Sequence, residues 1–111
     1  MKTTKEDFEK FKRIFKYWLK KSGMTQYNVV FKHEWVPGAS ADIDIEASND
    51  VVVRLSTDRD VSFGISSMAK HEFGHLVLAE LIRQINPPKY TAKMLSREES
   101  TADIIALLLG N

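Results

Sequence analysis

A segment between about residues 60 and 85 constrains the fold more than any other, because its apolar residues recur at helical spacing. The apolar residues form two stripes, with Phe73, Leu76 and Val77 on one side and Leu78, Leu81, Ile82 and Ile85 on another. A helix that is apolar on more than one side is expected to be largely buried. Ser62, Ser66 and Ser67 are candidate N-caps, and Asn86-Pro87-Pro88 ends the helix because proline cannot continue the hydrogen-bond ladder. A chain of 111 residues has room for one modest core, so we expect a single domain, residues 1–111, built around this helix.

The same segment carries His71-Glu72-Phe73-Gly74-His75, which reads H-E-x-x-H. Histidines four residues apart project from one face of a helix, and this spacing places two imidazole nitrogens on one tetrahedral metal ion, typically zinc. Glu72 lies beside that face, where it could take a proton from a metal-activated water. Such a short pattern also arises by chance on ordinary helices. The helical context and Gly74, which costs about 1 kcal/mol in a helix interior, favour a metal site.

The composition limits the kinds of metal site that are available. The chain has no cysteine, which excludes disulfides and every zinc site with Cys ligands. A zinc ion would therefore be held by carboxylates and by the histidines, which are His33, His71 and His75. Hydrophobic residues make up 43% and charged residues 28% of the chain, which is typical of a soluble globular domain.

The formal net charge of +1 gives the whole chain no strong preference for nucleic acid or anionic membranes. Basic residues nevertheless crowd the N-terminal segment, namely Lys10, Lys12, Arg13, Lys16, Lys20 and Lys21. They could localise the protein on nucleic acid, but a solvated helix face is favoured because Glu6, Asp7 and Glu9 dilute the positive field. No apolar run is long enough to span a bilayer, and the first residues lack the apolar core of a signal peptide. We therefore expect a cytoplasmic protein without a membrane partner.

The N-terminal segment is predicted to form a helix. Thr3-x-x-Glu6 is a capping-box pattern, and Gly23 suits the left-handed stop at the other end. One apolar stripe is expected to face the core, and it consists of Phe8, Phe11, Ile14, Phe15, Trp18 and Leu19.

Three segments with a period of two predict strands over 26–35, 41–47 and 51–55. In the first, Tyr27, Val29, Phe31, His33 and Trp35 share one face. The second has an acidic outer face, and the third has a mostly apolar run that favours a more buried position. A three-residue turn, 48–50, predicts that the last two strands pair as an antiparallel hairpin. With a final helix from about Ser96 to Leu109, the order of elements predicts an α+β domain with helices on one face of a small sheet.

Two histidines alone do not complete a catalytic zinc site, which needs three protein ligands. Glu99, Glu98 and His33 are the candidates for the third. Glu99 is preferred because Asp103, one helical turn on, could hydrogen-bond a ligand histidine and fix its orientation. The alternative is that Glu99 belongs to the capping box Ser96-x-x-Glu99. His33 is more often a packed or surface histidine than a ligand.

The chain resembles a minimal single-domain zincin of the gluzincin type, the minigluzincin metallopeptidases. His71-Glu72-Phe73-Gly74-His75 and Glu99-Ser100-Thr101-Ala102-Asp103 carry this resemblance. It implies that His71, His75 and Glu99 bind one zinc ion, that Glu72 is the general base and that Asp103 supports the ligands. It also implies that a peptide substrate adds to the sheet edge as an extended strand, and that some members are latent. The group that stabilises the transition state is not identifiable, with Tyr90, Arg97 and His33 as weak candidates. A catalytically silent binding or regulatory module and a nucleic-acid-associated protease remain alternatives.

Overall fold

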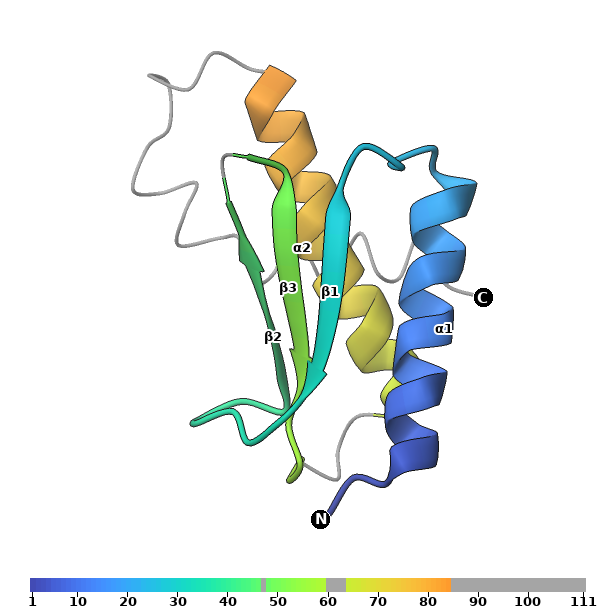
Figure 1. Ribbon diagram of the computed structural model, residues 1–111, viewed down its shortest axis with the longest axis vertical. Helices are drawn as coiled ribbons and strands as arrows, with labels where there is room; N and C mark the ends of the chain where they lie inside the picture. The colour runs from blue at the N-terminus through green and yellow to red at the C-terminus, as the bar shows by residue number, and fades with distance from the viewer. Residues whose placement is uncertain (47, 60–63, 85–111) are drawn as a thin grey trace.

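The computed structural model describes residues 1–46, 48–59 and 64–84. They form helix α1 (Lys5–Lys21), strands β1 (Asn28–His33), β2 (Ala41–Ile45) and β3 (Asp50–Leu55), and helix α2 (Ile65–Gln84). Both helices lie on one face of the sheet (Figure 1). The predicted α+β class and the order of these five elements are confirmed. The predicted final helix, 96–109, lies outside the described residues.

β3 is the central strand of the sheet, which has the order β1-β3-β2. β2 and β3 pair antiparallel, with Ile43 opposite Val53, which confirms the predicted hairpin. β1 pairs with β3 in parallel, with Phe31 opposite the same Val53, a pairing that the sequence did not predict. A strand with neighbours on both sides and helices over one face is shielded most, so the alternate residues Val51, Val53 and Leu55 are fully buried.

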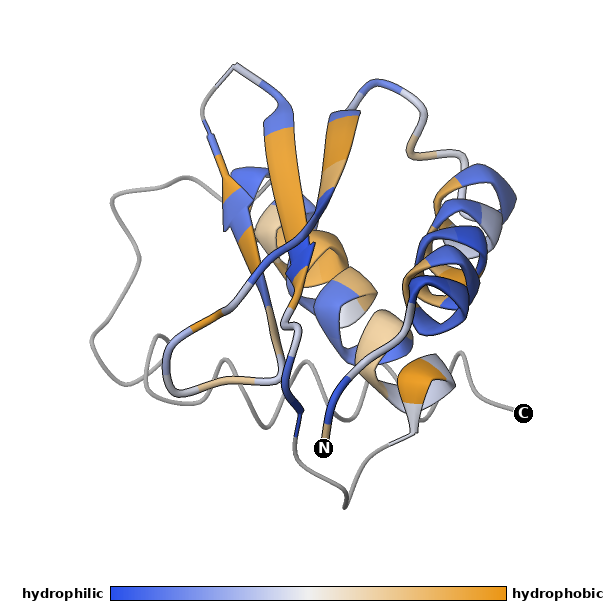
Figure 2. Ribbon diagram, turned by 60° about the horizontal axis from the view of Figure 1, so that its bottom comes forward, coloured by the Kyte–Doolittle hydropathy of each residue, from blue (hydrophilic) through white to orange (hydrophobic). Residues whose placement is uncertain are grey.

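The core joins α1, α2 and the inner face of the sheet. Phe11 and Phe15 of the predicted stripe are fully buried, and the other stripe residues pack around them. The ring of Phe15 lies edge to face against Phe31 of β1 and Phe73 of α2, with both centroid distances 5.5 Å. One aromatic side chain therefore connects three elements. In Figure 2 the outward turns of α1 are mostly hydrophilic, as expected for an amphipathic helix.

The start of α1 differs from the prediction by one residue. Thr4, not Thr3, is the N-cap: its hydroxyl accepts from the backbone N–H of Asp7 at 3.0 Å, and the Asp7 carboxylate accepts from the backbone N–H of Thr4 at 2.9 Å. Both threonines have an acid three residues later, so the local pattern fits either register. Thr3 is used elsewhere, because its backbone N–H donates to Thr57 at 2.9 Å and its side chain is buried.

The alternation in the sequence predicted that Trp35 shares one face of β1 with Phe31 and His33, and this prediction is wrong. The strand ends at His33, and Trp35 is 65% exposed. The backbone N–H of Glu34 still donates to Leu55, but the chain then leaves the sheet and buries Val36 in place of Trp35. The N–H of Val36 donates to the buried hydroxyl of Ser56 at 3.1 Å, which fixes this departure.

α2 begins at Ile65, so Ser66 and Ser67 lie inside the helix and do not cap it, while Ser62 lies outside the described residues. Its first half is buried as predicted, with Ala69, Phe73 and Leu76 fully buried. The second half is less buried than predicted, since Leu81 is 49% exposed. None of the helices in the described ranges is both long and apolar enough to cross a membrane.

Candidate metal centre

The buried half of α2 carries a cluster of His71, Glu72 and His75, whose potential ligand atoms all lie within 4.8 Å of one another. The helix itself produces the cluster, because residues three and four apart are neighbours on its surface. Glu72 and His75 are 5% and 7% exposed, and His71 is partly buried. The three side chains therefore meet where the helix enters the core.

The two imidazole rings approach each other through their Nε2 atoms. Nε2 of His71 lies 3.1 Å from Nε2 of His75, and the ring planes are 83° apart. Two nitrogens on one tetrahedral zinc ion, each about 2.0–2.1 Å from the metal, are separated by about 3.3 Å. The observed separation is close to this value. It also fits a hydrogen bond in which one ring N–H donates to the other ring, so the pair is arranged to share either a proton or a metal ion.

Glu72 occupies a position that an apolar residue would be expected to fill. Met68 and Leu76 lie one turn before and one turn after it on the helix, and both are buried. A buried carboxylate is costly unless a cation or hydrogen-bond donors compensate its charge. The two imidazole nitrogens could hold a metal ion, and the carboxylate of Glu72 lies beside them.

His33 lies in a different environment, where it is packed against other residues. This agrees with the prediction that it is a packed or surface histidine and not a metal ligand. Its Nε2 lies 2.7 Å from the hydroxyl oxygen of Thr3, and its ring stacks on Phe8 with centroids 5.0 Å apart. The Thr3 hydroxyl donates its single hydrogen to the carbonyl of Ser56 at 2.6 Å, so Nε2 of His33 must be the donor to Thr3. An Nε2 that carries a hydrogen has no lone pair for a metal, and His33 is not part of the described cluster.

The far end of α2 is fixed by a polar cluster that the sequence analysis missed. The phenol of Tyr27 donates to Glu80. The pKa of Tyr27 is raised to about 12, mainly because the phenol is buried and secondly because of this hydrogen bond. Arg83 lies over the Tyr27 ring, 5.4 Å from its centroid. Its guanidinium donates to the Glu46 carbonyl at 2.9 Å and to the side chain of Asn49. Glu80 lies one turn beyond Leu76 on the apolar stripe, and a carboxylate at such a position signals a buried partner.

The remaining predicted site residues lie outside the described residues. They are Glu99 and Asp103, together with the weaker candidates Glu98, Tyr90 and Arg97. The structure therefore places two of the predicted ligands and the predicted base together, and the third ligand stays a prediction. No protein-family model, curated protein or solved structure matches this chain significantly. The functional interpretation accordingly depends on the geometry of this cluster.

Proposed function

We propose that the protein is a zinc-dependent endopeptidase with His71, His75 and Glu99 as metal ligands, Glu72 as general base and Asp103 supporting the ligands. The observation that carries the proposal is the convergence of two imidazole Nε2 atoms 3.1 Å apart with a carboxylate of the same helix beside them. An isolated pair of histidines would support metal binding alone. The buried carboxylate next to them adds a group that can move a proton.

The proposed chemistry divides into what the metal supplies and what the chain supplies. A zinc ion held there would lower the pKa of a water and polarise the scissile carbonyl. Glu72 would accept the proton of the attacking water and later deliver it to the leaving amine.

The proposed substrate is a peptide segment bound in an extended conformation. Among the described strands, β2 is an edge strand that has β3 on one side, and it packs against α2. An edge strand offers every second backbone N–H and C=O to an added strand, which holds a peptide by main-chain hydrogen bonds. β2 therefore combines a free edge within the described sheet with proximity to the helix that carries His71 and His75.

The decisive variant is Glu72→Gln. We expect zinc content to stay near one per chain, because the proposed ligands His71, His75 and Glu99 all remain, while cleavage of a denatured protein substrate falls by about 10²–10⁴-fold with loss of the base. Glu80→Gln on the same helix is the matched control, since the amide oxygen can still accept from Tyr27. Cleavage that survives Glu72→Gln would remove Glu72 from the mechanism.

A second comparison tests the third ligand. Glu99→Gln is expected to weaken zinc binding by at least about tenfold more than Glu98→Gln, because only Glu99 is assigned to the metal. Metal content after dialysis against a weak chelator measures the difference, and equal effects would favour the capping-box role of Glu99. Stoichiometric zinc without any turnover in the parent protein would instead assign the fold to a binding or regulatory module.

A further inference from the structure

Basic and acidic residues are segregated along this chain. No Asp or Glu lies between Glu9 and Glu34, whereas seven basic residues do, namely Lys10, Lys12, Arg13, Lys16, Lys20, Lys21 and Lys32. This stretch therefore has a net charge of +7. The rest of the chain contains the other nine Lys and Arg and all 15 Asp and Glu, so its net charge is −6. The net charge of +1 is therefore the sum of two stretches of sequence with large charges of opposite sign.

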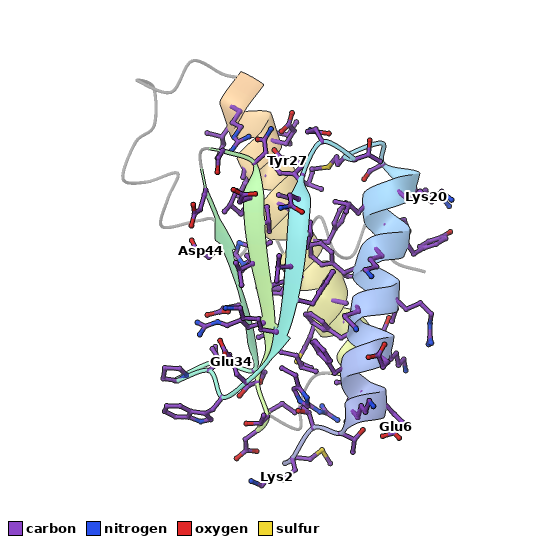
Figure 3. All side chains as sticks on the ribbon, viewed as in Figure 1. Lys2, Glu6, Lys20, Tyr27, Glu34 and Asp44 are labelled. Carbon is purple, nitrogen blue, oxygen red and sulfur yellow. The ribbon has the colours of Figure 1, made fainter. Side chains whose placement is uncertain are left out.

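The structure places the acidic residues of α1 away from its C-terminal half. Asp7 is engaged with Thr4 in the capping box, and Glu9 forms an ion pair with Lys12 at 3.0 Å. Beyond them, four exposed cations follow one another along the helix: Arg13, Lys16, Lys20 and Lys21. None of the four forms an ion pair with a carboxylate of the described residues. Figure 3 shows Lys20 extending away from the body of the protein at this end of α1.

Exposed aromatic surface is interleaved with these cations. Tyr17 is 53% exposed, and Trp18 is partly exposed beside it, with ring centroids 5.1 Å apart. The Lys21 ammonium lies 5.5 Å from the centroid of each of these two rings and donates to the Tyr17 hydroxyl at 3.2 Å. Proteins recognise single-stranded nucleic acid with two elements, which are cations that neutralise the phosphates and aromatic rings on which the bases stack. Both elements lie next to each other on this part of α1.

We infer that this half of α1, residues 13–21, is a docking surface for single-stranded nucleic acid. Lys20 and Lys21 also complement the negative C-terminal end of the helix dipole, but Arg13 and Lys16 lie in the middle of the helix, where that effect is absent. An anionic membrane fits the surface less well, because interfacial binding needs an apolar face and that of α1 is buried with Phe11 and Phe15. The inference does not depend on the proposed peptidase activity.

The two tryptophans allow a direct binding measurement on the full chain. Trp35 is 65% exposed after β1, so Trp35→Phe should leave the fold intact and make Trp18 the only tryptophan. We expect an oligothymidine of about 16 nucleotides to quench Trp18 fluorescence. With four cations on the backbone, raising salt from about 50 to 200 mM should weaken binding about 50-fold. No quenching at low salt overturns the inference.

Two pairs of variants locate the surface. The double variant Lys16→Gln, Lys20→Gln should lose only about sevenfold in affinity over the same salt range. The double variant Lys2→Gln, Lys5→Gln removes the same charge elsewhere, so its loss of affinity should stay close to that of the parent protein. Tyr17→Ala should weaken binding by about fivefold or more and Tyr17→Phe should not, because stacking needs the ring alone. Equal effects of the two lysine pairs, or of the two Tyr17 variants, overturn the inference. Phosphatidylserine vesicles that bind more tightly than the oligonucleotide would also overturn it and assign the surface to lipid.

Discussion

At the scale of residues, the fold changes the ionisation of Tyr27 in a way that can be measured. The side chain lies just before β1 (Figure 3) and is 5% exposed, and its phenol donates to Glu80 on α2. Burial is the main cause of the raised pKa, and the bond to Glu80 adds to it, although the positive charge of Arg83 acts in the opposite direction. Ionisation of Tyr27 would place a negative charge beside Glu80, so the folded state favours the protonated phenol.

We predict that Tyr27 makes stability fall with rising pH in alkaline solution. Its pKa is raised from 10.0 to about 12 in the folded protein, so the unfolded chain loses this proton first. The contribution is complete below pH 10 and is lost as the pH rises towards 12. Denaturant titrations at a series of pH values measure the slope, and Tyr27→Phe should flatten it. An unchanged slope in Tyr27→Phe would assign the alkaline loss to other groups.

At the scale of elements, two neighbouring threonines fix the start of α1 by different means. Thr4 caps the helix, and the donation from its backbone N–H is the main cause of the lowered pKa of the Asp7 carboxyl. Thr3 instead joins the N-terminus to the sheet, because its hydroxyl lies between the Ser56 carbonyl and Nε2 of His33. The sequence pattern fitted both threonines, and only the position of the partner groups distinguishes a cap from a tertiary contact.

We predict distinct costs for the two hydroxyls. Thr4→Ala should lower the free energy of unfolding by about 1 kcal/mol, and Thr4→Ser should leave it nearly unchanged, because serine caps equally well. Thr3→Val should cost about 1–3 kcal/mol, since the Ser56 carbonyl and the His33 N–H then lose their partner in a buried place. Urea unfolding provides the values. If Glu6→Ala destabilised the protein more than Asp7→Ala, the capping box would be the one that begins at Thr3.

At the scale of the whole molecule, the candidate metal centre and the core share one helix. Phe73, between the two histidines in sequence, is fully buried against Phe15 of α1. The other end of α2 is held by the contacts of Arg83 and Glu80 with the sheet side of the molecule. A metal ion that binds the folded cluster but not the unfolded chain therefore stabilises the entire domain by mass action.

We predict that zinc at about 100 times its dissociation constant adds about 2.7 kcal/mol of stability, which raises Tm by about 10 °C or more. Addition of a chelator should abolish the increase, as measured by calorimetry. His75→Ala should remove the response to zinc, whereas His33→Ala should retain it because His33 is held by Thr3 and Phe8. An identical response in both variants would exclude the cluster on α2 as the site.

The sequence by itself determined those features that depend on neighbours along the chain. Periodicity located α1, α2 and the three strands, and the spacing of His71 and His75 placed them on one face of a helix. The short turn between β2 and β3 also fixed their antiparallel pairing. Each of these signals arises within a few residues, where helix and strand geometry leave few alternatives.

Only the tertiary structure decided the features that depend on distant partners. β1 pairs in parallel with β3, across a strand that intervenes in sequence, and no local signal specifies that choice. Trp35 is exposed because Ser56 binds the chain where it leaves the sheet. Asp7 and Glu9 of α1 are engaged near its N-terminus, which leaves the cations from Arg13 to Lys21 together on one exposed surface. Burial and pairing result from the free energy of the whole packed domain, so they become definite only when all the elements are in place.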